Sequence, residues 1–461
     1  MKKINFKIIL SLLTIVFVLF SSVGCKTPQL LEFDTVSLQS QTIEYDGQDH
    51  SLSVTGVPEG ASVSYEGEKN YKNAGEYDIT VKIEKNGYNT KKLTAKLTIT
   101  KATLTVKSKP ISVLNGRVGV PEYTIEGFKA NDTITDIDVL PTFSGNLPAS
   151  VGVYNGAIEF SGASDNNYNF IYQNSDYTVT AYEILTENST EYVYFGLYPQ
   201  TKVSDDTIVA SLTYGIATGD IIADENGWYN YNGIKYAMMV SRLYTYGDNY
   251  DKYMDGTTIS DGEVCFFKVE PIKWKVISVK GNQRTLTTDL LLDVKQFHKS
   301  IETRTIDEKT IYSNNYEHSD IRSWLNQEFL QTAFGSNADD FIVTTEVVNG
   351  ADVSRDSDRY TACANTTDKV FMLSYSDVVS GCFDLEDTAS DTRVAIVSDY
   401  ARAKGAFMPV GEGGYYWLRC GSDSIRTVEV VNYEGDVSYL YYNVQNESCC
   451  VRPVIVFEIN S

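Results

Sequence analysis

The stretch Glu76-Tyr77-Asp78-Ile79-Thr80-Val81-Lys82-Ile83 alternates polar and apolar side chains along its whole length. An alternation with a period of two places every second side chain on one face of a β-strand. A second run, Leu93–Thr100, alternates in the same way, and neither run contains proline. The two runs therefore predict strands that each turn one apolar face toward a core.

Turn signals surround these strands throughout residues 36–102, as at Pro58-Glu59-Gly60 and Asn86-Gly87. Short strands between regularly spaced turns are typical of a small β-sandwich. Residues 103–182 repeat the plan, because Gly152-Val153-Tyr154 corresponds to Gly75-Glu76-Tyr77. The offset between the copies exceeds the roughly 20 to 50 residues of a solenoid repeat. The pattern therefore predicts one domain used twice.

Ala74-Gly75-Glu76-Tyr77, Tyr88-Asn89 and the closing strand Leu97–Ala102 resemble the mostly-bacterial immunoglobulin-like repeats of cell-surface proteins. The second copy departs from this pattern with Val151-Gly152 in place of Ala-Gly and with an insertion near residues 161–167. The resemblance implies spacers or binding modules and carries over no catalytic residue.

The N-terminus begins with lysines and continues with an apolar run, Ile8–Phe20, that ends at Ser22-Val23-Gly24-Cys25. A membrane span needs roughly 20 apolar residues, so the shorter run predicts a removable export signal over residues 1–24. Val23-Gly24-Cys25 resembles the lipobox of bacterial lipoproteins. This implies acylation of Cys25, a tether over residues 25–35, and attachment to the membrane of a bacterial cell envelope, outside the cytoplasm. An ordinary secretory signal is the alternative.

The formal net charge of −22 argues against a nucleic-acid partner, because a field of that sign repels phosphate. Apart from Cys25, six cysteines remain, which allow fifteen disulfide pairings or free buried thiols. With three histidines in the chain, a zinc site of the usual spacing has no basis, and we predict neither a metal nor a cofactor. These six cysteines are Cys265, Cys363, Cys382, Cys420, Cys449 and Cys450.

Residues 192–461 are expected to form one α+β domain after a polar connection over residues 183–191. The domain opens with a predicted strand, Val193–Gln200, closed by a turn at Pro199. Alternation over residues 266–279 and 285–291 predicts a β-hairpin around Gly281. Further strands are predicted over residues 416–419, 428–431, 437–442 and 451–457.

Two helices are predicted in this domain. Ser319 is a good N-cap for a helix that runs to about Phe334, with apolar residues at helical spacing. A shorter helix is predicted over residues 398–404, and Gly405 ends it.

Seven motifs in this domain resemble a bacterial domain family of unknown function found at the ends of exported proteins. No activity attaches to that family. A weaker similarity links the Trp-x-Arg segment to C-type-lectin-like and formylglycine-generating-enzyme-like folds. The motifs are Phe195-Gly196-x-Tyr198-Pro199-Gln200, Pro271-Ile272-x-Trp274-x-Val276, Ser319-x-Ile321-Arg322-x-Trp324-Leu325-Asn326, Asp368-Lys369-Val370-Phe371-x-Leu373-Ser374, Tyr400-Ala401-x-Ala403, Trp417-Leu418-Arg419 and Val451-Arg452-Pro453.

Candidate ligand-binding residues are Trp417, Arg419 and Arg452, which lie in two of these motifs. Arginine is a bidentate donor and tryptophan a stacking surface, although both residue types are also common core anchors. The cluster Glu317-His318-x-Asp320 could provide a general base, but a helix N-terminus also attracts acids without any catalysis. We assign no catalytic residue.

The sequence thus predicts a multidomain, mainly β protein with two immunoglobulin-like sandwiches and an α+β C-terminal domain. We expect a lipid-anchored surface protein whose C-terminal domain binds a glycan, a peptide or another extracellular partner. One alternative is an exported hydrolase or modifying enzyme with its site near His318 or Arg419. Another is a purely structural envelope protein.

Overall fold

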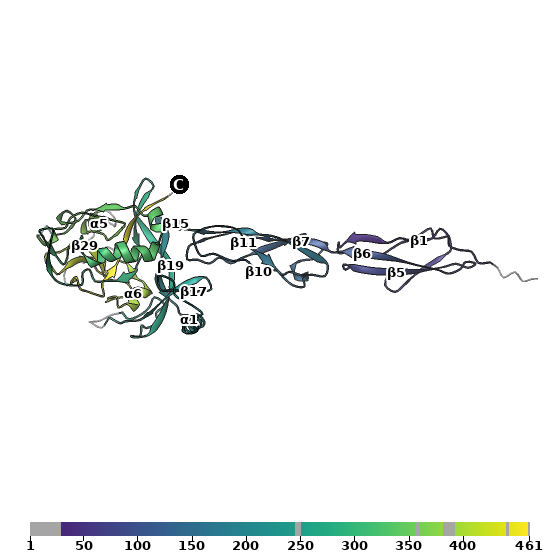
Figure 1. Cartoon of the computed structure of the whole chain (residues 1–461), viewed down its shortest axis with the longest axis horizontal. Helices are drawn as coiled ribbons and strands as arrows, with labels where there is room; N and C mark the ends of the chain where they lie inside the picture. The colour runs from purple at the N-terminus through teal and green to yellow at the C-terminus, as the bar shows by residue number, and fades with distance from the viewer. Residues whose placement is uncertain (1–28, 245–249, 356–358, 381–391, 439–441, 460–461) are drawn as a thin grey trace, which may run out of the picture. The chain divides into compact units, whose positions relative to one another are not determined.

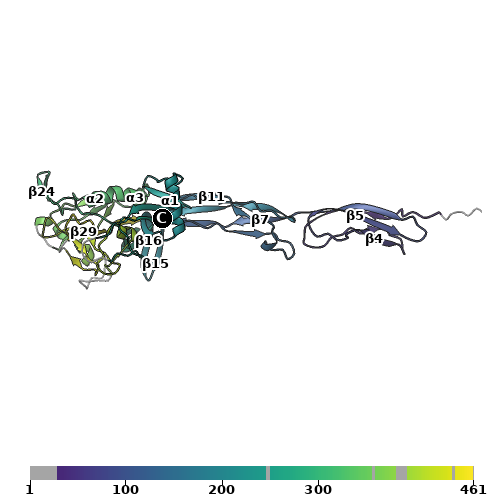
Figure 2. The same ribbon diagram turned by 90° about the horizontal axis from the view of Figure 1, so that it is seen from below.

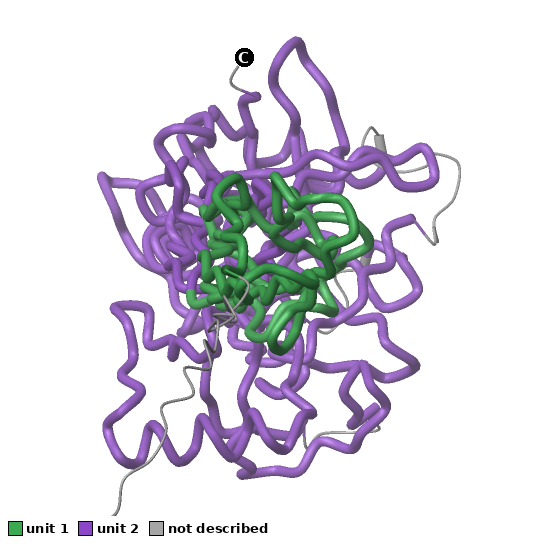
Figure 3. The backbone as a smooth tube through the Cα atoms, turned by 90° about the vertical axis from the view of Figure 1, so that its right-hand side faces the viewer, with its two compact units in different colours: residues 1–106, 125–141, 162–171 green, residues 107–124, 142–161, 172–461 purple. Residues whose placement is uncertain are grey.

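The computed structural model describes residues 29–244, 250–355, 359–380, 392–438 and 442–459. Cys25, the predicted signal segment, Cys382 and part of the strand predicted over residues 437–442 lie outside these ranges. The chain divides into two compact units, with residues 1–106, 125–141 and 162–171 in unit 1 and the rest in unit 2 (Figure 3). The division falls within the second sandwich, and each unit is described by itself.

The first sandwich contains both strands that the alternating runs at residues 76–83 and 93–100 predict. Alternate side chains of β5 (Gly75–Glu84) are buried, among them Ile79, Val81 and Ile83. They pack with Leu97 and Ile99 of β6 (Lys91–Thr100) in one apolar core. These two predictions are confirmed. The sandwich consists of a four-stranded sheet in the order β2 (Gln41–Glu44), β6 (Lys91–Thr100), β5 (Gly75–Glu84), β4 (Ser62–Glu66), and the pair β1 (Ser37–Leu38) and β3 (Val54–Thr55).

The second sandwich has two three-stranded sheets and a short strand pair. One sheet orders β13 (Tyr168–Gln173), β7 (Ala102–Ser108) and β9 (Tyr123–Glu126), and the other orders β11 (Gly152–Ile158), β14 (Ser175–Thr180) and β8 (Ile111–Leu114). The pair is β10 (Thr142–Phe143) with β12 (Phe160–Ser161), and a short helix, η1 (Ile134–Asp136), precedes it.

The C-terminal domain begins earlier than expected, with a β-hairpin (Figure 1). The polar connection predicted over residues 183–191 is wrong, because β15 (Tyr182–Glu187) pairs with β16 (Thr190–Lys202). The predicted turn at Pro199 is also wrong, since β16 continues through it. Pro199 lacks an N–H, and the strand accommodates it beside a register shift that falls between Pro199 and Lys202.

Two larger sheets form the body of this domain. The first orders β15, β16, β19 (Val264–Lys280), β20 (Gln283–Thr288), β33 (Val454–Glu458) and β27 (Val370–Phe371), with β17 (Trp228–Tyr231) and β18 (Ile234–Val240) joined through β19. The second orders β22 (Asp293–Val294), β32 (Cys450–Val451), β29 (Tyr416–Gly421), β30 (Val428–Val431) and β31 (Val437–Ser438). The hairpin around Gly281 is confirmed.

Three strand pairs and several short helices complete the domain. The pairs are β21 (Leu290–Leu291) with β28 (Ile396–Val397), β23 (Thr303–Ile306) with β24 (Lys309–Tyr312), and β25 (Thr345–Val347) with β26 (Thr366–Asp368). The short helices are α4 (Asn337–Phe341), η3 (Ala351–Val353), η4 (Arg359–Thr361) and α5 (Tyr375–Ser380).

The predicted long helix is confirmed, with one irregularity. Ser319 accepts a hydrogen bond from the Arg322 N–H and caps α2 (Asp320–Trp324). A π-helical turn, η2 (Leu325–Phe329), then joins α2 to α3 (Leu330–Phe334). Helix α3 packs beside β16 (Figure 2), and the apolar side chains of the whole helix are part of the main core. This helix forms one wall of the candidate site.

The predicted second helix is confirmed as α6 (Asp399–Ala403), with Ser398 as its N-cap. Helix α1 (Asp206–Thr218) was not predicted. It is rich in β-branched residues, which have lower helix propensity, although Asp205 offered an N-cap signal. No helix among the described residues is long and apolar enough to cross a membrane.

The cysteines that the structure describes are free thiols. They are Cys265, Cys363, Cys420, Cys449 and Cys450. Burial raises the pKa of Cys363 to about 11 and that of Cys420 to about 12. Thiols with such pKa values hold their protons at neutral pH and act as small apolar side chains.

Candidate functional site

The three residues predicted to contact a ligand lie inside the C-terminal domain. Trp417 is fully buried in β29, and its indole Nε1–H donates to the Lys295 carbonyl oxygen at 2.8 Å. A tryptophan whose ring and N–H are both satisfied by the core has no face left for a ligand. This burial supports the core-anchor alternative for Trp417 over the ligand-binding one.

Arg419 is 6% exposed and uses its guanidinium to hold surrounding segments together. Its Nη1 donates to the Met372 carbonyl oxygen and to Asp377 Oδ2, both at 2.6 Å, while Nε and Nη2 donate to the Val348 carbonyl oxygen. Burial would raise the pKa of Asp377, but the Arg419 charge and the hydrogen bonds from Ser374 outweigh it, so the pKa is lowered. Arg419 is thus a structural residue.

Arg452 has the same character. It is 3% exposed, its Nε donates to the Thr288 carbonyl oxygen at 3.0 Å, and its Nη1 donates to the Arg393 carbonyl oxygen at 3.1 Å. The Tyr416 hydroxyl lies 3.2 Å from the same Nη1. Buried carbonyl groups need such donors, so Arg452 joins strands in the core and does not face a ligand.

The cluster Glu317-His318-x-Asp320 is not brought together as one site. His318 Nε2 lies 3.6 Å from Glu317 Oε1, whereas Asp320 Oδ2 lies 2.8 Å from Nδ1 of a different histidine, His298. Burial lowers the pKa of His298 despite the nearby Asp320 carboxylate. His298 is 1% exposed and the Asp320 side chain 41% exposed, so a buried histidine here contacts a partly exposed carboxylate at a helix N-terminus.

A small cavity of about 130 Å³ gathers polar side chains that sequence reasoning did not assign. We call it the polar pocket. Strand β16, the helix of α2, η2 and α3, and the end of α6 all contribute walls to it. Its walls are Tyr198, Pro199, Asn226, Trp228, Asp293, Trp324, Glu328, Phe329, Thr332, Tyr400 and Lys404.

Asp293 is the buried anchor of the polar pocket. Its side chain is 1% exposed, Oδ2 accepts from the Tyr198 hydroxyl at 2.6 Å, and Oδ1 lies 2.5 Å from Lys404 Nζ. Burial would lower the pKa of Lys404, but the Asp293 carboxylate outweighs it, and the pKa is raised. The pocket therefore holds a fixed ion pair whose ammonium remains charged at neutral pH.

Two hydroxyl groups of the pocket have no hydrogen-bond partner in the described part of the chain. The Tyr400 hydroxyl and the Thr332 hydroxyl make no hydrogen bond there, and burial, reinforced by Asp293, raises the pKa of Tyr400 to about 12. The Glu328 side chain is 71% exposed, and its nearest cation, Lys295 Nζ, lies 3.9 Å away. The pocket can therefore both donate hydrogen bonds to a bound molecule and accept them from it.

A larger cavity of about 570 Å³ adjoins the polar pocket, because Asn226, Trp228 and Thr332 line both. Its other walls include residues of β16, β18, β19, α3 and α4, and two loops of the second sandwich, residues 115–117 and 149–151. All of these residues belong to unit 2.

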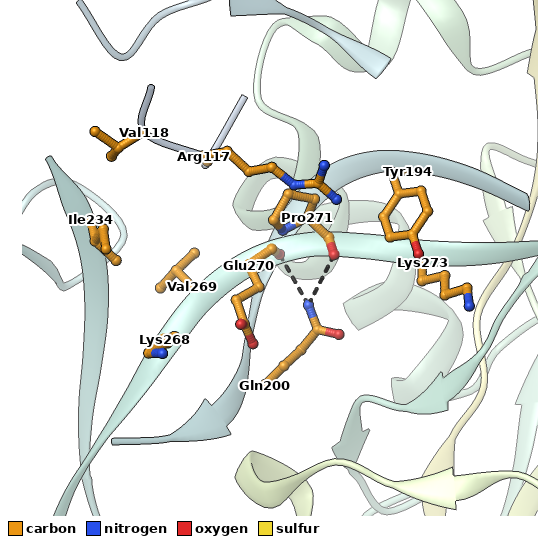
Figure 4. Close-up of a pocket in the computed structure, with 11 residues that line it drawn as sticks. Arg117, Val118, Tyr194, Gln200, Ile234, Lys268, Val269, Glu270, Pro271 and Lys273 are labelled. Atoms are coloured by element: carbon orange, nitrogen blue, oxygen red, sulfur yellow. Dashed lines mark hydrogen bonds between the residues drawn. The ribbon is translucent and has the colours of Figure 1, made fainter. Parts of the chain in front are cut away.

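A third cavity, of about 520 Å³, contains polar groups that are already paired (Figure 4). Gln200 Nε2 donates to the carbonyl oxygens of Glu270 and Pro271 at 3.0 and 3.3 Å. Lys273 Nζ lies 2.6 Å from Glu187 Oε2, and Arg117 Nη1 lies 3.1 Å from Glu183 Oε2. Such groups are less available to a ligand than those of the polar pocket.

The sequence contained a partial signal for the polar pocket. Tyr198, Trp324 and Tyr400 each lie in one of the motifs quoted for the domain family, and the fold brings the three together. Asp293 and Glu328 lie in no such motif, so only the fold places them here. The sequence motifs pointed instead to Trp417, Arg419 and Arg452.

The fold and the comparisons define a multidomain, mainly β protein. Family models match an MBG domain at residues 34–103, an MBG domain of the YGX type at residues 104–178, and the "Domain of unknown function (DUF6273)" at residues 282–459. The chain thus carries two MBG domains followed by DUF6273, as the resemblances predicted. Asp293, Glu328 and Tyr400 lie within the last match, and Tyr198 precedes it. None of the curated proteins matches the chain.

Proposed function

We propose that the protein is a bacterial lipoprotein, acylated at Cys25 and held at the cell envelope, whose C-terminal domain binds a glycan in the polar pocket. The N-terminal sequence supports the anchor. The two MBG domains then act as spacers between the membrane and the binding domain. The observation that carries the binding proposal is that the unpaired Thr332 and Tyr400 hydroxyls lie in one cavity with the Lys404 ammonium and the Glu328 carboxylate.

The chemistry of these groups suits a neutral molecule with many hydroxyls. The Tyr400 and Thr332 hydroxyls and the remaining Lys404 N–H groups can donate hydrogen bonds, and Glu328 can accept them. The charge of Lys404 is balanced by Asp293, so an anionic ligand gains little there and would meet Glu328. A sugar offers both donors and acceptors without net charge.

Contacts between the MBG domains support a spacer role. Within unit 1, Asp132 Oδ2 accepts hydrogen bonds from the Tyr45 hydroxyl at 2.7 Å and from the Tyr168 hydroxyl at 2.6 Å. Tyr45 belongs to the first MBG match and the other two residues to the second. Lys129 Nζ also lies 2.8 Å from Glu44 Oε1 across the same junction. A carboxylate shared in this way resists bending between the two domains.

The binding proposal is tested with the full chain on an array of glycans and peptidoglycan fragments. We expect binding that Tyr400→Phe and Thr332→Ala each weaken about three- to tenfold, the effect of losing one hydrogen bond. Tyr214→Phe is the matched control, since Tyr214 lies on α1 and is 70% exposed. The proposal would be overturned if the chain bound none of the probes. It would also be overturned if Tyr400→Phe and Thr332→Ala both bound as tightly as the wild-type chain.

The anchor is tested separately by cell fractionation and labelling with a clickable fatty acid. We expect the wild-type chain to carry the label and to remain with the membrane. Cys25→Ala should lose both properties. A Cys25→Ala chain that keeps the label would contradict acylation at this residue.

A further inference from the structure

The polar pocket alone is too small to hold a whole ligand. At about 130 Å³ it has room for about four waters of roughly 30 Å³ each. Ligand sites usually enclose roughly 300–1,000 Å³. The adjoining cavity of about 570 Å³ falls within that range. Asn226, Trp228 and Thr332 line both spaces, so a molecule seated in one can continue into the other.

Unpaired amide and hydroxyl side chains line the larger cavity as well. The side chains of Asn115, Asn226, Gln331 and Asn337 make no hydrogen bond within the described residues. Each amide group offers both donors and an acceptor. This composition matches the hydroxyl and acetamido groups of an amino sugar, since both of these also donate and accept.

The loop that brings Asn115 to the cavity is held firmly against the C-terminal domain. Arg117 Nη1 lies 3.1 Å from Glu183 Oε2 on β15, and the Arg117 guanidinium lies 5.3 Å from the ring centroid of Tyr194 on β16 (Figure 4). Gly116 has a φ of +87°, and a Cβ there would lie 2.5 Å from Leu197 Cδ2. Glycine allows this close approach, so the wall formed by the second sandwich exists before any ligand binds.

We infer that the ligand is an oligosaccharide containing N-acetylated amino sugars, which runs from the polar pocket into the larger cavity and contacts the second MBG domain. This inference rests on the proposed function, because it presupposes that the polar pocket binds a glycan. It adds that the second MBG domain is part of the binding site in addition to being a spacer.

The test uses the full chain and N-acetylglucosamine oligomers of one to six units, with affinity measured by calorimetry. We expect affinity to rise with length beyond the first unit. Asn115→Ala and Gln331→Ala should each weaken binding of the hexamer about three- to tenfold, the effect of one lost hydrogen bond, and leave monomer binding unchanged. Asn146→Ala and Gln327→Ala are controls, since neither residue lines the cavities. Thermal unfolding of each variant verifies that it is folded.

Several results would overturn the inference. Equal affinity for the monomer and the hexamer would exclude the larger cavity from the binding site. Full hexamer binding by both Asn115→Ala and Gln331→Ala would do the same. In either case, weaker monomer binding by Tyr400→Phe would leave the polar pocket as the site. Failure of these oligomers beside binding of other glycans would exclude the acetamido preference and leave the proposed function standing. Failure of every glycan would overturn both.

Discussion

Two sets of polar residues in the C-terminal domain differ in how completely their hydrogen bonds are satisfied. Arg419 and Arg452 direct their N–H groups at backbone carbonyls of the core. In the polar pocket, Lys404 has one acceptor, Asp293, and the Tyr400 hydroxyl has no partner in the described residues. A fully paired group holds the fold together, whereas an unpaired group beside a cavity is free to bind. Residue type alone does not make this distinction.

The largest effect is expected at Arg419. Arg419→Ala removes the cation beside Asp377, whose side chain is 34% exposed, and leaves the Met372 and Val348 carbonyl oxygens without the Arg419 donors. Losing this partly buried pair together with these hydrogen bonds costs about 3 kcal/mol. The free energy of unfolding, measured by urea denaturation, should fall by that amount. A loss below about 1 kcal/mol would contradict the structural role, since that is the value of an exposed pair.

A smaller loss is expected when the pocket anchor is changed. Tyr198→Phe keeps the ring but removes the hydroxyl that donates to Asp293, which is 1% exposed. Leaving such an acceptor short of one donor costs about 1–3 kcal/mol. Urea denaturation again measures the loss, and Tyr65→Phe, whose hydroxyl donates to a backbone carbonyl in the first sandwich, is the matched control. An unchanged free energy of unfolding would show that the hydrogen bond from Tyr198 to Asp293 does not stabilise the fold.

The Arg419–Asp377 pair also predicts a dependence on pH. The pKa of Asp377 is lowered in the folded state, so its stabilising contribution is complete above the unfolded pKa of about 3.9 and is lost as the pH falls through the folded value. Asp377→Asn should therefore lower stability at pH 7 and flatten its decline below about pH 4. Urea titrations of both proteins between pH 7 and pH 2.5 measure this. Parallel curves would exclude the contribution.

The smallest effect on stability is expected for Tyr400→Phe. Its hydroxyl makes no hydrogen bond in the described part of the protein, so the free energy of unfolding should change by no more than about 0.5 kcal/mol. A thermal-unfolding comparison with the wild-type chain measures the change. If the free energy of unfolding fell as much as in Tyr198→Phe, the Tyr400 hydroxyl would be a paired, structural group. Tyr400 would then not differ from Arg419 in this respect.

Local patterns in the sequence predicted much of the fold. The strand Gly75–Glu84 and the helix capped by Ser319 follow from periodicity and a capping residue, which act over a few neighbouring positions. Helix α1 was not predicted because its many β-branched residues have low helix propensity. Strand β15 was not predicted because its polar residues resemble a linker. Tertiary pairing decides such segments.

The candidate site was much harder to predict. Its lining comes from five separate parts of the chain, at Tyr198, Trp228, Asp293, Glu328 and Tyr400, and only the fold brings them together. Arg419 was a candidate because it lies in a motif. A sequence does not show, however, which side-chain donors will be bonded to backbone carbonyl oxygens. Burial and pairing are properties of the folded chain.

The π-helical turn η2 has a consequence for insertions and deletions. A hydrogen bond from the Leu330 N–H to the Leu325 carbonyl oxygen closes this turn, so it holds one residue more than an α-helical turn. Every side chain after it is rotated about the helix axis by roughly 100° relative to a regular α-helix. Trp324 before the turn and Thr332 after it nevertheless line the same pocket. A relative that lacks one residue here would turn a different side chain toward the polar pocket and different apolar side chains toward the core.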